Sequence, residues 1–215
     1  MTVEGRVRAE RVEVRRNRDH ILAAAEQYYA THQADPSMSE LATLASVGNA
    51  TLYRRFPSIA DVIKALYERH FAIQQAIVDD MLKQSTGWQG VVTMITGIAT
   101  MTLEHPAVPR ITRKMLELEP ALRHGAQWDG PLREVTRRAQ SEGALRPDVD
   151  ANDLTLAAFR LGEYSYLPEH ARARIVARQA AIVLDGIRAQ AVTTPLPGAA
   201  ISTDEIQTYF HTSIR

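Results

Sequence analysis

Apolar side chains recur at helical spacing along most of this chain, and this periodicity limits the folds that the chain can adopt. No run of alternating apolar and polar residues bounded by turn signals indicates a β-strand. The chain has 215 residues, of which 45% are hydrophobic, so it can bury a substantial core. We therefore expect a folded, all-α protein.

The first part of the chain predicts three helices separated by two tight breaks. The first helix runs from about Arg16 to His32. A short second helix begins after Ser37, because Ser37 and Glu40 have the spacing of a capping box. Gly48 permits a tight turn before a short third helix from about Asn49 to Phe56. Two short helices joined by such a turn form a helix-turn-helix, whose second helix fits a DNA major groove about 12 Å wide.

Six further helices are predicted downstream, separated by Pro, Gly or Asp-Asn breaks. The first is long and is the link to the rest of the chain; the set comprises Ile59 to Lys83, Trp88 to Glu104, Pro109 to Leu118, Gln127 to Glu142, Asp153 to Tyr166 and Glu169 to Ala191. The last segment, Thr193 to Arg215, opens with prolines and has room for one short helix near Asp204 to His211. Much of it reads as a loosely packed tail.

The stretch from Leu41 to Ser58, LATLASVGNATLYRRFPS, closely resembles the signature of the TetR family of transcriptional regulators. The resemblance is strong from about Asn17 to Leu66 and is confined downstream to the number and placement of helices. It implies an N-terminal helix-turn-helix domain followed by a larger helical domain that binds a small-molecule effector and dimerises. The expected organisation is a flexible basic arm at 1–15, the DNA-binding domain at 16–57, the effector and dimerisation domain at 58–192, and a C-terminal tail at 193–215.

Carried over position by position, the resemblance implies a set of DNA contacts on and beside the third helix: Ser37, Asn49, Ala50, Thr51, Tyr53, Arg54, Arg55 and Ser58. Asn49 can pair with an adenine edge, and an arginine with guanine O6 and N7. Ala50 or the Thr51 methyl group can pack against a thymine methyl group. The hydroxyl groups of Thr51 and Tyr53 suit phosphates. A packed aromatic for Tyr53 and a solvated face for the two arginines remain as alternatives.

Three positions depart from the family pattern. Ser46 stands where glycine is usual in the turn, and Gly48 where a serine or threonine usually caps the recognition helix. Ile59 stands where a lysine commonly meets a phosphate.

The arm before the first helix is rich in arginine and would suit phosphates or a minor groove. The alternative is a solvated segment with intrahelical ion pairs, such as Glu4 with Arg8.

Two groups of residues belong to the functions expected of the larger domain. An apolar effector pocket is expected around methionines and tryptophans, although ordinary core packing is the alternative for each: Trp88, Met94, Met101, Met115, Leu118 and Trp128. A homodimer interface is expected on the last two long helices, because their small residues permit close approach of two helices. The residues expected in it are Ala158, Gly162, Ile175, Ile182 and Gly186. Packing within one chain is the alternative for this second group.

Other functional classes receive little support. The chain has no cysteine, which removes disulfides and cysteine-ligated zinc, and its formal net charge is zero. No nucleotide-binding, nucleophile-elbow or zinc-protease motif occurs, and the histidines are scattered, so no catalytic residue, metal or cofactor is expected. No apolar stretch is long enough to span a membrane, and the cytoplasm is the expected compartment.

We expect a repressor that is released from a near-palindromic double-stranded DNA operator by an unknown effector. The alternative is a helical protein-interaction adaptor.

Overall fold

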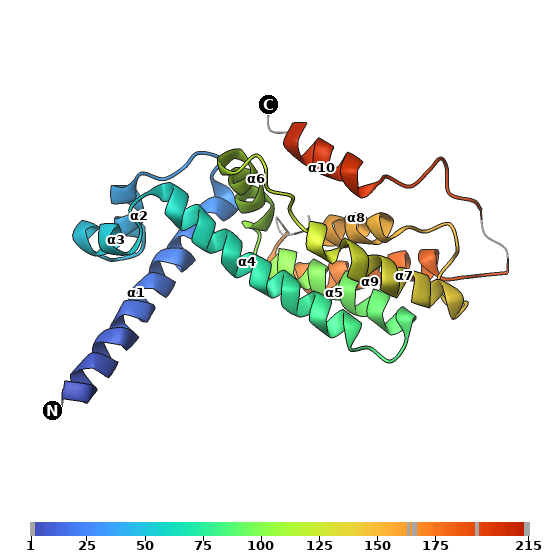
Figure 1. Ribbon diagram of the computed structural model, residues 1–215, viewed down its shortest axis with the longest axis horizontal. Coiled ribbons are helices and arrows are strands. Elements are labelled where there is room, and N and C mark those ends of the chain that lie inside the picture. Colours follow the sequence, from blue (N-terminus) through green and yellow to red (C-terminus); the bar gives the residue numbers. More distant parts are fainter. Residues whose placement is uncertain (1–2, 163, 165–166, 192–193, 213–215) are drawn as a thin grey trace. The chain divides into compact units, whose positions relative to one another are not determined.

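The computed structural model describes residues 3–162, 164, 167–191 and 194–212, with side chains from Arg16 onward apart from 169 and 209–212. Ten α-helices and a 3-10 turn at Ala126–Trp128 occupy these ranges, and the described part contains no strand (Figure 1). The helices are α1 Val3–Thr31, α2 Met38–Leu44, α3 Asn49–Arg55, α4 Ile59–Leu82, α5 Gly87–Glu104, α6 Val108–Leu118, α7 Asp129–Ser141, α8 Ala151–Gly162, α9 Glu169–Ile187 and α10 Thr203–Thr212. The all-α prediction is confirmed.

Two helix ends differ from the sequence expectation. Helix α1 begins at Val3 rather than near Arg16, so the segment expected as a flexible arm is helical. The alternation of glutamate and arginine at helical spacing in this segment favours that outcome. Helix α9 ends at Ile187 rather than Ala191, because the backbone there pairs with the loop after α7: the Arg146 N–H donates to the Ile187 carbonyl at 3.1 Å. Part of the predicted end of α8, at 163 and 165–166, lies outside the described residues.

The first compact unit comprises Met1–Arg69 together with Ala107–Leu118. Its core consists of apolar side chains contributed by α1, α2, α3, the first part of α4, and α6: Ile21, Leu22, Ala25, Tyr29, Leu41, Leu52, Val62, Leu66, Val108, Ile111 and Met115. Each fully buried large side chain stabilises the fold by about 1.5–3 kcal/mol relative to its exposed state. The unit therefore extends past residue 57, where the DNA-binding domain was expected to end. It includes the first part of α4, which continues without a break, and α6, which packs against α1.

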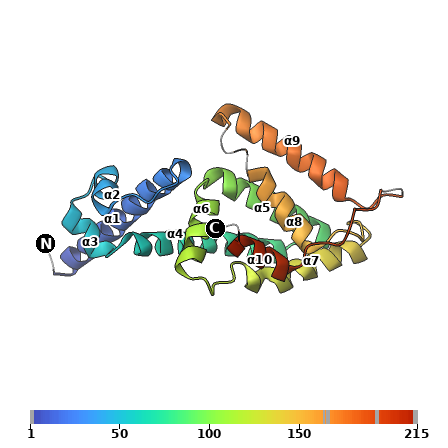
Figure 2. The same ribbon diagram turned by 90° about the horizontal axis from the view of Figure 1, so that it is seen from above.

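The second compact unit comprises His70–Pro106 and Glu119–Arg215, and α5 is its central helix. Helix α5 packs mainly against α8 and α7, and α8 runs beside it in both views (Figure 2). The α5–α8 contact is close because Gly162 presents no side chain to Thr102. This unit also brings together His70 and His105, which lie far apart in the sequence and whose ring centroids are 5.6 Å apart.

The C-terminal segment is attached to the second unit by polar contacts. The Arg146 guanidinium donates to the Thr194 carbonyl at 2.7 Å, and the Thr203 hydroxyl donates to Asp129 at 2.6 Å. In α10, the side-chain amide of Gln207 donates to the His124 carbonyl at 2.7 Å. The short helix predicted near Asp204 to His211 is confirmed as α10, and the segment around it is tied down more firmly than a loosely packed tail.

Candidate DNA-binding surface

Helix α2 is fixed at its first turn by the predicted capping box. The Ser37 hydroxyl accepts a hydrogen bond from the Glu40 N–H at 3.1 Å, and the Glu40 carboxylate accepts one from the Ser37 N–H at 3.3 Å. These two bonds satisfy donors that the helix start would otherwise leave open. A hydroxyl group can accept and donate at once, so the cap is compatible with the predicted phosphate contact of Ser37, which stays a prediction.

The turn between α2 and α3 is closed by two backbone hydrogen bonds. The Val47 N–H donates to the Ala42 carbonyl at 3.0 Å, and the Ser46 N–H donates to the Thr43 carbonyl at 3.1 Å. This is the pairing of a Schellman motif, whose residue after the helix end adopts the left-handed conformation. Ser46 does so, with φ of 53°. The departure from glycine at this position therefore places a serine where glycine is the favoured residue.

Helix α3 has one buried face and one exposed face. Leu52 is fully buried and Phe56, at the end of the helix, is nearly so, whereas Tyr53 is 53% exposed. Asn49, Ala50 and Arg54 are exposed as well. The spacing of these four exposed residues puts them on one side of the helix, one turn apart in two pairs. The structure thus brings together four of the predicted DNA-contacting residues on a single solvent-facing surface.

Thr51 and Arg55 lie at the edges of this surface and are half-buried. The Nε atom of Arg55 is buried and has no hydrogen-bond partner among the described residues. At the end of α3, the Arg18 guanidinium from α1 lies over the Phe56 ring, 5.6 Å from its centroid. Arg54 is therefore the more accessible of the two arginines, and DNA contact by Arg55 remains a prediction.

Ser58 has a structural partner, Asp61, that was not predicted. Its hydroxyl donates to the Asp61 carboxylate at 2.6 Å and accepts from the Asp61 N–H at 3.3 Å, so Ser58 caps α4. The signal was present in the sequence, since Ser58 and Asp61 have the three-residue spacing of a helix cap. Direct DNA contact by Ser58 remains a prediction.

Most of the predicted effector-pocket residues that lie in the second unit fill its core. Met94, Met101 and Trp128 are buried. Trp128 stacks on Phe71 with centroids 4.8 Å apart, and its indole N–H donates to the Gln75 side chain at 2.7 Å. Trp88 is half-buried, with the Arg188 guanidinium 4.3 Å from its ring centroid. Met115 and Leu118 belong to α6 and thus to the first unit, where Leu118 is 41% exposed.

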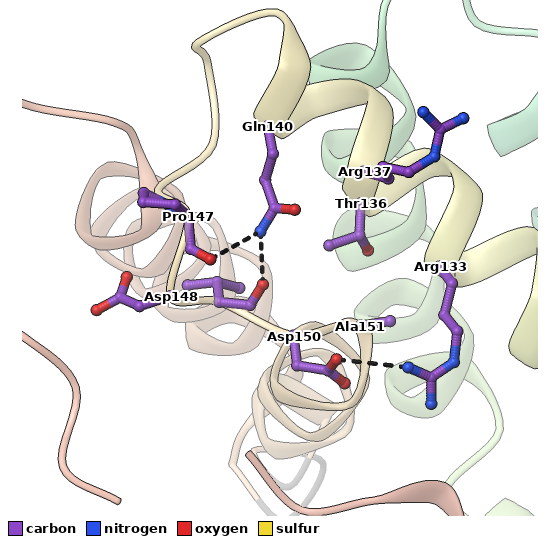
Figure 3. A pocket seen from close by; sticks show the side chains of 9 residues that line it. Arg133, Thr136, Arg137, Gln140, Pro147, Asp148, Asp150 and Ala151 are labelled. Atoms are coloured by element: carbon purple, nitrogen blue, oxygen red, sulfur yellow. Dashed lines mark hydrogen bonds and ion pairs between the residues drawn. The ribbon is translucent and has the colours of Figure 1, made fainter. Parts of the chain in front are cut away.

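The structure contains a groove of about 340 Å³ between α7 and the segment that leads into α8, and it includes none of the predicted pocket residues (Figure 3). Arg133 on its wall lies 3.6 Å from the Asp150 carboxylate, and the Gln140 amide donates to the Val149 carbonyl at 2.9 Å. The groove is lined mostly by polar and charged residues: Arg133, Thr136, Arg137, Gln140, Pro147, Asp148, Val149, Asp150 and Ala151. It therefore differs in chemistry from the apolar pocket that was predicted.

The predicted dimer-interface residues divide into two groups. Ala158 is fully buried, and Gly162 is buried against Thr102, where a Cβ atom would lie 2.2 Å from the Thr102 Cβ. The small size of Gly162 is therefore explained by packing of α8 on α5 within one chain, the alternative to a dimer interface at this position. Ile175 is half-buried. Ile182 is 59% exposed, and the Cβ position of Gly186 has no neighbour within 4 Å, so these two residues remain open to a partner.

Comparison with known proteins supports the fold. No protein-family model and no curated protein sequence matches the chain. Among solved structures, the chain is similar to the ketosteroid transcriptional regulator KstR2 of Mycobacterium tuberculosis, with 18% identity, a TM-score of 0.65, and coverage of 80% of this chain and 95% of that one. It is also similar to a TetR transcriptional regulator from Streptomyces coelicolor, with 24% identity, a TM-score of 0.56, and coverage of 81% and 99%.

A third similar structure is a γ-butyrolactone receptor described as an ArpA-like protein, with 16% identity, a TM-score of 0.62, and coverage of 94% of this chain and 98% of that one. These neighbours are regulators and receptors rather than enzymes. In the described part of this chain, no helix is both long enough and apolar enough to cross a membrane. The resemblance in the sequence from Leu41 to Ser58 is thus matched in three dimensions, and the chain has the fold of the TetR-family transcriptional regulators.

Proposed function

We propose that this protein is a DNA-binding transcriptional regulator, a repressor that a small-molecule effector releases from a near-palindromic operator. The observation that carries the proposal is the exposed face of α3. Asn49, Ala50, Tyr53 and Arg54 share this face, and the capped helix α2 and the closed turn at Ser46 hold it in place. Amide, guanidinium and hydroxyl groups on an exposed helix of this size match the donors and acceptors of a DNA major groove.

The effector would be an apolar or amphipathic small molecule, and the active form a homodimer in the cytoplasm. The proposed kind of effector is supported by two similar structures, since one is described as a ketosteroid transcriptional regulator and another as a γ-butyrolactone receptor. Dimerisation would use the exposed part of α9 around Ile182 and Gly186, with Ile175 at its border. A two-fold dimer would place two copies of α3 in successive major grooves, about 34–36 Å apart.

Selection of bound fragments from genomic DNA, followed by affinity measurement on the best fragment, tests the proposal. If Arg54 reads a base, the Arg54→Ala variant should lose about 1–3 kcal/mol of binding free energy and relax preference at one position of each half-site. Tyr53→Phe should weaken all sequences alike, as expected for a phosphate contact. Arg137→Ala removes the same charge from an exposed position on α7 and serves as the control. Absence of any selected fragment would favour the adaptor instead.

A further inference from the structure

Helix α6 is part of the first compact unit, although it follows α5 in the chain. Val108, Ile111, Met115 and Leu116 are buried, and α6 lies beside the C-terminal end of α1 (Figures 1 and 2). The connection from the end of α5 at Glu104 to the start of α6 at Val108 consists only of residues 105–107.

Arg110 of α6 holds the C-terminal end of α1. Its guanidinium donates to the Tyr29 carbonyl at 2.5 Å and also to the His32 carbonyl. Helix α1 ends at Thr31, so the Tyr29 carbonyl belongs to its last turn, whose carbonyl groups lack partners within the helix, and the His32 carbonyl follows directly after it. A guanidinium group suits this role because it offers several N–H donors in a fixed plane and carries a positive charge at the negative end of the helix dipole.

Lys114, one turn further along α6, holds the loop between α1 and α2. Its ammonium group lies 2.6 Å from the Asp35 carboxylate, and its side chain is only 14% exposed. The Tyr29 hydroxyl donates to the same Asp35 oxygen at 2.8 Å. Burial and the neighbouring Asp35 raise the pKa of Tyr29, so the phenol remains a donor at neutral pH. Asp35 is therefore fixed from two sides.

We propose that Arg110 and Lys114, the α6 clamp, are positioning residues of the DNA-binding surface. Asp35 lies two residues before Ser37, the cap of α2. By holding Asp35, the clamp fixes where α2 begins relative to the end of α1. Helix α2 packs on both α1 and α3, so a released loop lets the recognition helix shift relative to α1. The clamp rests on the proposed function, and it assigns to two α6 side chains the placement of α2, and through α2 of the recognition helix.

The first test compares Lys114→Met with Lys83→Met on the DNA fragment selected above. Methionine keeps the apolar stem of the lysine side chain but removes its charge. Lys83 pairs with Asp80 at the surface of the second unit and controls for the loss of one positive charge. Lys114→Met should weaken operator binding about 3- to 30-fold with an unchanged dependence on salt, whereas Lys83→Met should bind like wild type. A salt slope reduced by about one would mean that Lys114 itself contacts phosphate, and would overturn the clamp.

The second test exchanges the charges of the ion pair. Asp35→Lys and Lys114→Asp should each weaken operator binding, and the double variant should recover most of the affinity, because the pair is restored in reverse. Losses that simply add in the double variant would show that the two residues act independently, and would overturn the proposal.

Hydrogen exchange separates failure of the clamp from failure of the proposed function, because it needs no DNA. In Lys114→Met, amides in the loop at 32–37 and in α2 should exchange faster, while those of α5 and α8 should not change. If wild type binds no DNA but the exchange result is obtained, the proposed function is wrong, and the result shows only that Lys114 holds the loop at 32–37 and α2. If Lys114→Met matches wild type in both exchange and operator affinity, the clamp is wrong and the function stands.

Discussion

At the scale of single residues, the turn of the helix-turn-helix carries a conformational cost. Ser46 has φ of 53°, and in the described part of the chain it is the one residue other than glycine with a positive φ. The left-handed conformation costs an L-residue about 1–2 kcal/mol, because its Cβ atom approaches the following carbonyl oxygen. The Schellman hydrogen bonds of Ser46 and Val47 and the packing of α2 on α3 hold the residue there.

Ser46→Gly should stabilise the protein by roughly 0.5–1 kcal/mol. Relief of the backbone strain exceeds the extra conformational entropy that glycine gives the unfolded chain, about 0.4–1 kcal/mol. Urea denaturation of the variant measures the difference, and Ser46→Val should destabilise because β-branching disfavours this conformation further. A destabilised Ser46→Gly variant would show that the serine side chain makes a contribution that its backbone conformation does not explain.

At the scale of helices, close approach and capping across long sequence distances decide how the second unit is assembled. Gly162 of α8 allows contact with α5 at Thr102. Glu142, just after α7, caps the start of α5: its carboxylate accepts from the Gly87 N–H at 2.8 Å and from the Trp88 N–H at 3.3 Å. These contacts bridge more than fifty residues of sequence, and neither follows from a local motif.

Gly162→Ala should destabilise the protein by about 1–3 kcal/mol, although alanine normally favours a helix. The added Cβ atom would lie 2.2 Å from the Thr102 Cβ, so α8 and α5 must move apart. Gly130→Ala is the matched control, because Gly130 is also helical, its Cβ position has no neighbour within 4 Å and it lies outside the proposed dimer interface, so it should not destabilise. Equal effects of the two substitutions in thermal denaturation would contradict the close α5–α8 contact.

Glu142→Gln should lower the thermal midpoint at neutral pH, and the difference from wild type should shrink in acid. The backbone N–H of Gly87 and, to a lesser extent, that of Trp88 lower the pKa of Glu142. The carboxylate therefore contributes stability above the unfolded-state pKa of about 4.3, and this contribution is lost as pH falls through the lower folded-state pKa. Glu134→Gln, which breaks a surface ion pair with Arg137, provides the comparison. A difference independent of pH would exclude the capping carboxylate as its source.

At the scale of the whole molecule, the chain forms two compact units whose boundaries do not follow the order of the sequence. Helix α4 contributes to both units, and α6 belongs to the first although both of its neighbours, α5 and α7, belong to the second. The exposed residues also fall into distinct regions. Tyr53 is exposed on α3 of the first unit and Ile182 on α9 of the second, and these two surfaces serve the two associations that we propose.

Ile182→Asp should convert the proposed homodimer to monomer at micromolar concentration and weaken operator binding. Ile182 is 59% exposed in the single chain, and burying an isoleucine side chain in an interface stabilises it by about 1.5–3 kcal/mol, so the dimer dissociation constant should rise roughly 10- to 100-fold or more. Leu82→Asp is the control, because Leu82 is 43% exposed at the end of α4. Analytical ultracentrifugation measures both variants. A dimer of wild-type affinity in Ile182→Asp would place the interface elsewhere.

The sequence by itself determined the helix-turn-helix and the all-α class. Ser37 and Glu40, the turn before Gly48 and the helical spacing of apolar residues act over a few residues, so their effect does not depend on the rest of the fold. The exposed face of α3 followed from the same periodicity. The residues proposed to contact DNA followed from the resemblance of the stretch from Leu41 to Ser58 to the TetR signature, which is also local in the sequence.

Only the tertiary structure decided which long-range surfaces are free and which are buried. A glycine on a helix has the same local signal whether it faces a partner or its own chain, and packing against Thr102 settled this for Gly162. Met94 and Trp128 are equally suited to a pocket or a core, and the neighbouring helices made them core. Arg110 and Lys114 have no local motif, because their partners at Tyr29, His32 and Asp35 lie about eighty residues earlier in the chain, and only folding brings them together.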